Sequence, residues 1–118
     1  MSKTSNPLGN IFISQRAIAT IAYQAALDTY GLVGLTAKNL AIGIAQALVK
    51  DPTLGIDIHY DGQKIKIDLY VIMEYGTRIK SVAASVSDAV RYQIEKATGI
   101  PVSEVNIHVR GLRVSNPD

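Results

Sequence analysis

The stretch from Ile65 to Gly99 places the strongest constraint on how this chain can fold. Its first part has an apolar residue at every second position, which predicts a β-strand with one buried face and one solvated face. After Tyr75-Gly76-Thr77 the apolar spacing changes to three and four residues, and this predicts an amphipathic helix that ends at Gly99. A long strand followed by a long helix predicts a sheet with helices packed against it. The alternating strand residues are Ile65, Ile67, Leu69, Val71 and Met73.

The other segments extend this pattern to one two-layer α+β domain, a mixed β-sheet with helices packed on one face in the order β-α-α-β-β-α-β. We expect a flexible arm at 1–9, the domain at 10–113 and a tail at 114–118. Within the domain the patterns predict strands at 10–13, 55–60 and 105–109, with helices at 15–29 and 37–50. The helix at 37–50 is apolar on two sides, so it would be sandwiched or pressed against another chain.

Asp61-Gly62 is typical of a two-residue β-hairpin turn. Such a turn fixes which residues face each other across the two strands. It also separates an apolar side from a side on which opposite charges meet. The predicted pairs are Tyr60 with Gln63, Ile58 with Ile65, Ile56 with Ile67, Asp57 with Lys66 and His59 with Lys64.

Composition excludes several classes of function. The chain has 118 residues, 47% of them hydrophobic, which fits one ordered domain. It has no cysteine, so thiol catalysis, disulfides and zinc–cysteine sites are excluded. A net charge of +2 gives no support for a strongly basic nucleic-acid binder. The polar start, Met1 to Asn10, and the lack of a long apolar run predict a cytoplasmic protein without direct membrane insertion.

The residues able to do chemistry form no catalytic or metal-binding pattern. Asp57, His59 and Asp61 alternate along one strand, but the lysines predicted opposite them disfavour a metal, so we interpret them as a solvated strand face. No nucleophile or carboxylate is placed to complete a triad with His59 or His108. We therefore predict no catalytic, cofactor-binding or metal-binding residue. A small enzyme would need a pocket that joins one of these histidines to a carboxylate.

The solvated face of the predicted sheet is the best candidate for an interaction surface. Exposed tyrosine and isoleucine among polar residues are typical of a contact surface between proteins. The second apolar side of the helix at 37–50 is another candidate. The interaction face predicted on the sheet contains Tyr70, Ile72, Arg110, His59 and His108.

Gly31-Leu32-Val33-Gly34 is a G-x-x-G between two predicted helices. The order of elements around it resembles the KH module, in which such a loop clamps a nucleic-acid backbone. KH-like nucleic-acid binding is therefore an alternative function. The spacers of such loops are commonly basic or polar, whereas Leu32 and Val33 favour burial as an apolar link after the helix.

Several short motifs, weak singly but specific in their order and spacing, resemble the alkaline shock protein family of Gram-positive bacteria, which includes the Gls-type stress proteins. The likeness covers nearly the whole chain and is greatest to the short cytoplasmic form. It is least in 41–53. The motifs begin at Gly9 before Ile11 and Ile13, at Tyr30-Gly31, at Tyr75-Gly76-Thr77, at Thr98-Gly99-Ile100 and at Val105-Asn106-Ile107.

The resemblance implies a non-enzymatic role in the envelope stress response and cell-wall homeostasis. It implies a homo-oligomer that docks on membrane-anchored protein partners from the cytoplasmic side. It also implies a link, as an accessory protein, to a neighbouring kinase of the fatty-acid or dihydroxyacetone type. The family supplies no catalytic residue and no cofactor to carry over to this chain.

Overall fold

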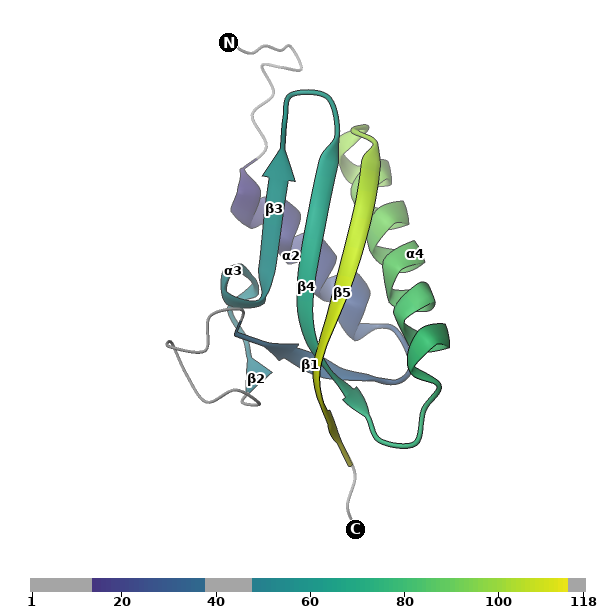
Figure 1. Cartoon of the computed structure of the whole chain (residues 1–118). Helices are drawn as coiled ribbons and strands as arrows, with labels where there is room; N and C mark the ends of the chain where they lie inside the picture. Colours follow the sequence, from purple (N-terminus) through teal and green to yellow (C-terminus); the bar gives the residue numbers. More distant parts are fainter. Residues whose placement is uncertain (1–13, 38–47, 115–118) are drawn as a thin grey trace.

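The computed structural model describes residues 14–37 and 48–114, which form a five-stranded sheet with helices on one face (Figure 1). The long helices α2 and α4 lie side by side behind the sheet. In chain order the elements are α2 (Gln15–Leu27), β1 (Leu32–Thr36), β2 (Leu48–Val49), α3 (Pro52–Gly55), β3 (Ile56–Tyr60), β4 (Ile65–Glu74), α4 (Ile79–Thr98) and β5 (Val102–Arg113).

Strand β4 is the centre of the sheet. One of its sides pairs with β5 in parallel from Ile65 to Glu74, and the register shifts at Ser103 and at Arg110, which have no Cα partner in β4. Its other side is shared by two antiparallel strands, with β3 pairing from Ile65 to Leu69 and β1 pairing from Val71 to Met73. The short β2 pairs with β1 at the end of the sheet. A parallel pair requires a long crossover, and α4 supplies it.

The predicted buried face of β4 is confirmed. The alternating residues Ile65, Ile67, Leu69, Val71 and Met73 are all 0% exposed and belong to one hydrophobic core. The helices cover this face with narrow apolar stripes. Small alanine side chains in α2 let that helix lie close to the sheet and to α4. The buried helix residues are Ile18, Ala19, Ala22, Ala25 and Ala26 in α2, and Val82, Val86, Val90 and Ile94 in α4.

The predicted helix caps are also confirmed. The Ser14 hydroxyl accepts a hydrogen bond from the Ala17 N–H at 3.1 Å and so begins α2. Gly99 has a left-handed backbone with φ 75°, and its N–H donates to the Glu95 carbonyl at 2.8 Å. The first helix ends at Leu27, slightly before the predicted end at Thr29.

The α+β class, the mixed sheet and the helices on one face are confirmed. The strands β1 and β2 were not predicted. The predicted helix at 37–50 is wrong at its end, because Leu48 and Val49 form β2, and its central part, 38–47, lies outside the described residues. The predicted arm at 1–9, the strand at 10–13 and residues 115–118 of the tail also lie outside them.

The predicted register of the hairpin is wrong by two residues. Tyr60 pairs with Ile65, and His59 pairs with Lys66, so the loop contains four residues instead of two. The Asp61 carboxylate causes this, since it accepts hydrogen bonds from the N–H groups of Gln63 (2.9 Å) and Lys64 (3.0 Å) and closes a wider turn. A shift of two preserves the faces, but it leaves Asp57 opposite Asp68 instead of Lys66.

The G-x-x-G segment is not a loop between two helices. Gly31 has φ +96° and turns the chain out of α2, and Leu32 then begins β1, whose Gly34 pairs with Ile72. From Leu32 onward, the backbone of this segment therefore pairs with β4 in the sheet. This corrects the KH-like alternative, because the segment that would clamp a nucleic acid is a strand.

Candidate functional site

The sheet face opposite the helices collects most of the polar side chains of β3, β4 and β5. We call it the open face. The described helices α2 and α4 both lie on the other face (Figure 1). The alternation of β4 and the pairing registers define its members, which are Asp57 and His59 of β3, Lys66, Asp68 and Tyr70 of β4, and Glu104, Asn106, His108 and Arg110 of β5.

Asp68 is at the centre of the open face. Its Oδ1 lies 3.0 Å from His108 Nε2 and accepts a hydrogen bond from Asn106 Nδ2 at 3.1 Å, while its Oδ2 lies 3.6 Å from His59 Nε2. The His108 ring donates from Nε2, because an ionised carboxylate can only accept. Only 18% of the Asp68 side chain is exposed. One carboxylate therefore connects both neighbouring strands.

These contacts keep the Asp68 carboxyl ionised. Burial is the largest single influence on its pKa and acts to raise it. The hydrogen bonds from His108 and Asn106 and the attraction of the two histidines act in the opposite direction and together outweigh burial. The pKa of Asp68 therefore lies below its ordinary value.

Beside this cluster, three side chains form a stack. The His108 ring lies on the Tyr70 ring with centroids 4.6 Å apart and an angle of 12° between the planes. The Arg110 guanidinium lies over the same tyrosine, 4.9 Å from the ring centre. Stacked rings and a cation over a ring face are attractive geometries. Because His108 also contacts Asp68, the stack and the carboxylate cluster restrain each other.

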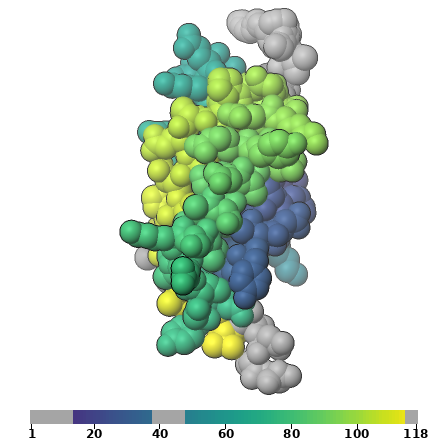
Figure 2. Space-filling view, turned by 90° about the vertical axis from the view of Figure 1, so that its right-hand side faces the viewer, coloured from purple at the N-terminus to yellow at the C-terminus, as the bar shows by residue number. Residues whose placement is uncertain are grey.

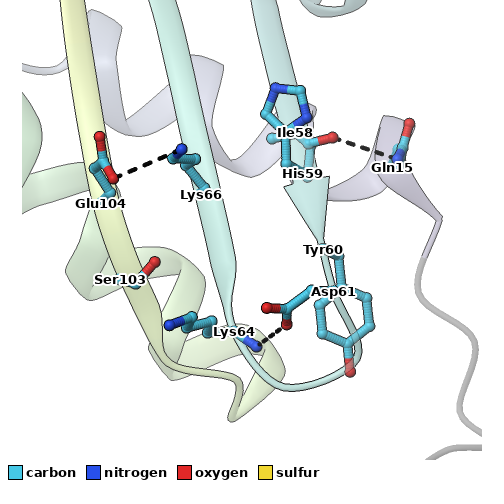
Figure 3. A pocket seen from close by; sticks show the side chains of 9 residues that line it. All are labelled: Gln15, Ile58, His59, Tyr60, Asp61, Lys64, Lys66, Ser103 and Glu104. Atoms are coloured by element: carbon cyan, nitrogen blue, oxygen red, sulfur yellow. Dashed lines mark hydrogen bonds and ion pairs between the residues drawn. The ribbon is translucent and has the colours of Figure 1, made fainter.

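At the hairpin end of the sheet, a hollow of about 530 Å³ borders the open face (Figure 3). His59, Lys64 and Lys66 line it together with Asp61 and Glu104. Lys66 Nζ lies 3.9 Å from Glu104 Oε1, with both side chains about half exposed. The mixture of both charge signs gives the hollow no preference for a purely anionic or purely cationic ligand.

The structure brings four of the five predicted interaction residues together, namely Tyr70, Arg110, His59 and His108. Ile72 is the exception, because it is only 1% exposed and offers no surface to a partner. In the register it pairs with Gly34 on one side and Gly111 on the other.

Sequence reasoning missed Asp68 and Asn106 as parts of the site. They meet only through the parallel pairing of β4 with β5, for which the sequence gives no turn signal. His59 lines the hollow with the carboxylates of Asp61 and Glu104, so the kind of pocket that the small-enzyme alternative requires is present at His59, whereas His108 and Asp68 do not line it. Within 14–37 and 48–114, no group of three His, Asp or Glu side chains is arranged so that it could hold a metal ion. Among these residues there is also no helix with the length and apolarity needed to cross a bilayer.

Solved structures with a similar fold include C-terminal domains of MamM. The copper form of that domain aligns with a TM-score of 0.52 and 12% identity, covering 88% of this chain and 92% of that chain. A histidine variant of the same domain gives 0.51 and 14%, covering 83% and 98%. At this identity the likeness shows the fold alone.

Sequence comparison gives closer relatives. The uncharacterised protein YloU of Bacillus subtilis is 41% identical over 111 residues, which cover 92% of each chain. The uncharacterised protein Spy1614 of Streptococcus pyogenes is 27% identical over 108 residues, or 90% of this chain and 89% of the relative. The model of the alkaline shock protein family, described as having a cell envelope-related function, matches residues 3–114. The family resemblance predicted from the motifs is therefore confirmed, and the chain belongs to the alkaline shock protein family.

Proposed function

We propose that this protein is a non-enzymatic, self-associating adaptor in envelope stress and cell-wall homeostasis. It acts in the cytoplasm and reaches the membrane by docking its open face on a membrane-anchored protein. Membership of a family with a cell envelope-related function supports the setting. The link to a kinase of the fatty-acid or dihydroxyacetone type stays a prediction.

The stack of Tyr70, His108 and Arg110 is the observation that carries this proposal. Tyrosine and arginine are the residue types that dominate binding energy at protein interfaces. Their side chains usually lose rotamer freedom on binding, which weakens the complex. Here the ring contacts and the Asp68 hydrogen bond already restrain them. The open face therefore offers a partner an ordered aromatic and cationic patch.

A partner that fits this patch presents a carboxylate beside an apolar or aromatic side chain. The carboxylate would pair with Arg110, and the apolar group would pack on the tyrosine–histidine stack. The neighbouring Lys66 and Glu104 would form the polar rim, where charges influence the rate and specificity of association more than affinity.

Site-specific photo-crosslinking tests the proposal. A benzophenone amino acid at position 70, in the chain expressed in Bacillus subtilis, should crosslink to an identified membrane-anchored protein. Arg110→Ala in the same chain should remove the crosslink, since the cation that orients the partner is lost. Mass spectrometry of the crosslinked band identifies the partner.

The chain offers a matched control on the helix layer. Tyr92 of α4 is 59% exposed and has Lys96 Nζ 5.7 Å from its ring centre, so it is also a tyrosine with a cation. The benzophenone at position 92, with or without Lys96→Ala, should give no crosslink to that protein. Equal crosslinking from both positions, or none from position 70, would contradict the proposal.

A further inference from the structure

The outer edge of β5 is a second surface of the open sheet. Among the described residues, β5 pairs with β4 on one side and with no strand on the other. Figure 2 looks at this edge and shows β5, in yellow-green, uncovered beside α4. An unpaired edge strand is a template for a further strand, and Val109 (37% exposed) and Leu112 (43%) add apolar surface to it.

The hydrogen bonds of β4 establish which backbone groups of β5 point outward. The Ile65 N–H donates to the Pro101 carbonyl at 2.9 Å, so it points towards β5. Backbone groups alternate along a strand, and Ile67, Leu69 and Val71 therefore point the same way. In a parallel pair the residues opposite them point away. These are Val105, Ile107 and Val109, whose N–H and C=O groups are directed to the free edge.

We propose that a second copy of this chain pairs with this edge, β5 against β5 and antiparallel, with Ile107 opposite its own counterpart. The inference rests on the self-association in the proposed function and adds its surface and register. An antiparallel self-pair is a two-fold interface, in which one patch must complement itself. The sheets of both copies would then be continuous, with α2 and α4 of both copies on one side.

The sequence of β5 is self-complementary in this register. Glu104 of one copy lies opposite Arg110 of the other, and Val105 lies opposite Val109. Asn106 lies opposite His108, so donors and acceptors also face each other. Opposite charges directly across an antiparallel pair are stabilising, and paired β-branched residues pack well.

In other registers, the opposite charges and the apolar residues of the two strands no longer face each other. A shift that moves the pairing by one position places the apolar side of one strand on the polar side of the other. Centring the pair on Asn106 places Arg110 opposite Val102. Centring it on His108 places Glu104 opposite Leu112. The charge pattern therefore favours Ile107 as the centre and a second copy as the occupant.

Charge reversal tests the register. In sedimentation equilibrium over micromolar to near-millimolar concentrations, Glu104→Arg and Arg110→Glu should each weaken the dimer roughly tenfold, since like charges then meet twice across the two-fold axis. The double variant Glu104→Arg/Arg110→Glu should restore most of the affinity. The two positions are about 20 Å apart along one strand, so this rescue requires two chains.

Proline at the edge provides an independent test. Val109→Pro removes an outward N–H, and proline is accepted on an edge strand when that N–H faces solvent. Its dimer should weaken at least as much as those of the charge variants, with cooperative thermal unfolding retained. Dimerisation unaffected by the proline and charge variants would overturn this inference and leave self-association standing. A wild-type chain that is monomeric throughout would overturn both.

Discussion

The two faces of the sheet are held in different ways. On the covered face, five consecutive inward residues of β4 are 0% exposed and are held by burial, which has no directional requirement. On the open face, Asp68 is held by a hydrogen bond with His108 at 3.0 Å and a contact with His59 at 3.6 Å, and Tyr70 is held by a ring stack at 4.6 Å. Alternation within one strand specifies the covered face, whereas the open face depends on which strands become neighbours.

The largest difference in stability is expected between substitutions at two consecutive β4 residues, one on each face of the sheet. Leu69→Ala leaves a cavity in the core and should lower the free energy of unfolding by about 2–5 kcal/mol. Tyr70→Ala, one residue along, removes the ring contacts with His108 and Arg110 and should cost about 0.5–1.5 kcal/mol. Equilibrium unfolding in guanidinium chloride measures both. Equal losses would mean that the open face is as important for stability as the core.

Two glycines with nearly the same positive φ allow the effect of a close helix contact to be measured separately from the effect of backbone strain. Gly31 (φ +96°) would place a new methyl 2.6 Å from Val82 Cγ2, whereas Gly62 (φ +97°), at the hairpin tip, has open space. Gly62→Ala should cost about 1–2 kcal/mol from the backbone. Gly31→Ala should cost about 1–3 kcal/mol more, because Val82 is short and cannot move aside. Thermal unfolding of the two variants should therefore differ, and equal losses would contradict a close helix contact at Gly31.

The carboxylate cluster predicts a pH dependence. Since the folded-state pKa of Asp68 lies below its ordinary value of about 4, its contribution to stability is present above that value and is lost as pH falls below it. Asp68→Asn should thus flatten the fall in stability between pH 5 and pH 2, measured by urea unfolding at a series of pH values. Asp88→Asn, an exposed aspartate of α4, is the control and should leave the wild-type slope. An unchanged slope in Asp68→Asn would contradict the cluster.

The smallest effect is expected at the rim of the open face. Lys66 and Glu104 are 3.9 Å apart with both side chains about half exposed, so solvent screens their attraction. Lys66→Ala should change the free energy of unfolding by less than about 1 kcal/mol in urea. A greater loss would mean that ion pairs, and not only the Asp68 cluster and the stack, stabilise this face.

Local patterns were sufficient for the covered face. Alternation identified β4, the helical spacing identified α4, and Gly99 marked the end of that helix. Each of these signals acts within a few residues, so no knowledge of the fold is required. The class of the domain follows from them.

The predictions from sequence were wrong or incomplete for features that depend on one side chain or on pairing with a strand distant in the sequence. The Asp61 carboxylate widened the hairpin loop and moved the register. The dipeptide Leu32-Val33 forms a strand because β4 is available to pair with it, which no local pattern indicates. The role of Asp68 in the site was not predicted, because its partners Asn106 and His108 are 38 and 40 residues away in the chain.

The place of β5 after β4 and α4 in the chain has a consequence during synthesis. Residues 102–113 leave the ribosome after the β4 residues with which they pair, so the side of β4 that β5 occupies stays bare until β5 itself has been made. Nascent chains expose this hydrogen-bonding edge to one another, and crowded polysomes would favour wrong strand pairing there. Truncation before Val102 would make that exposure permanent.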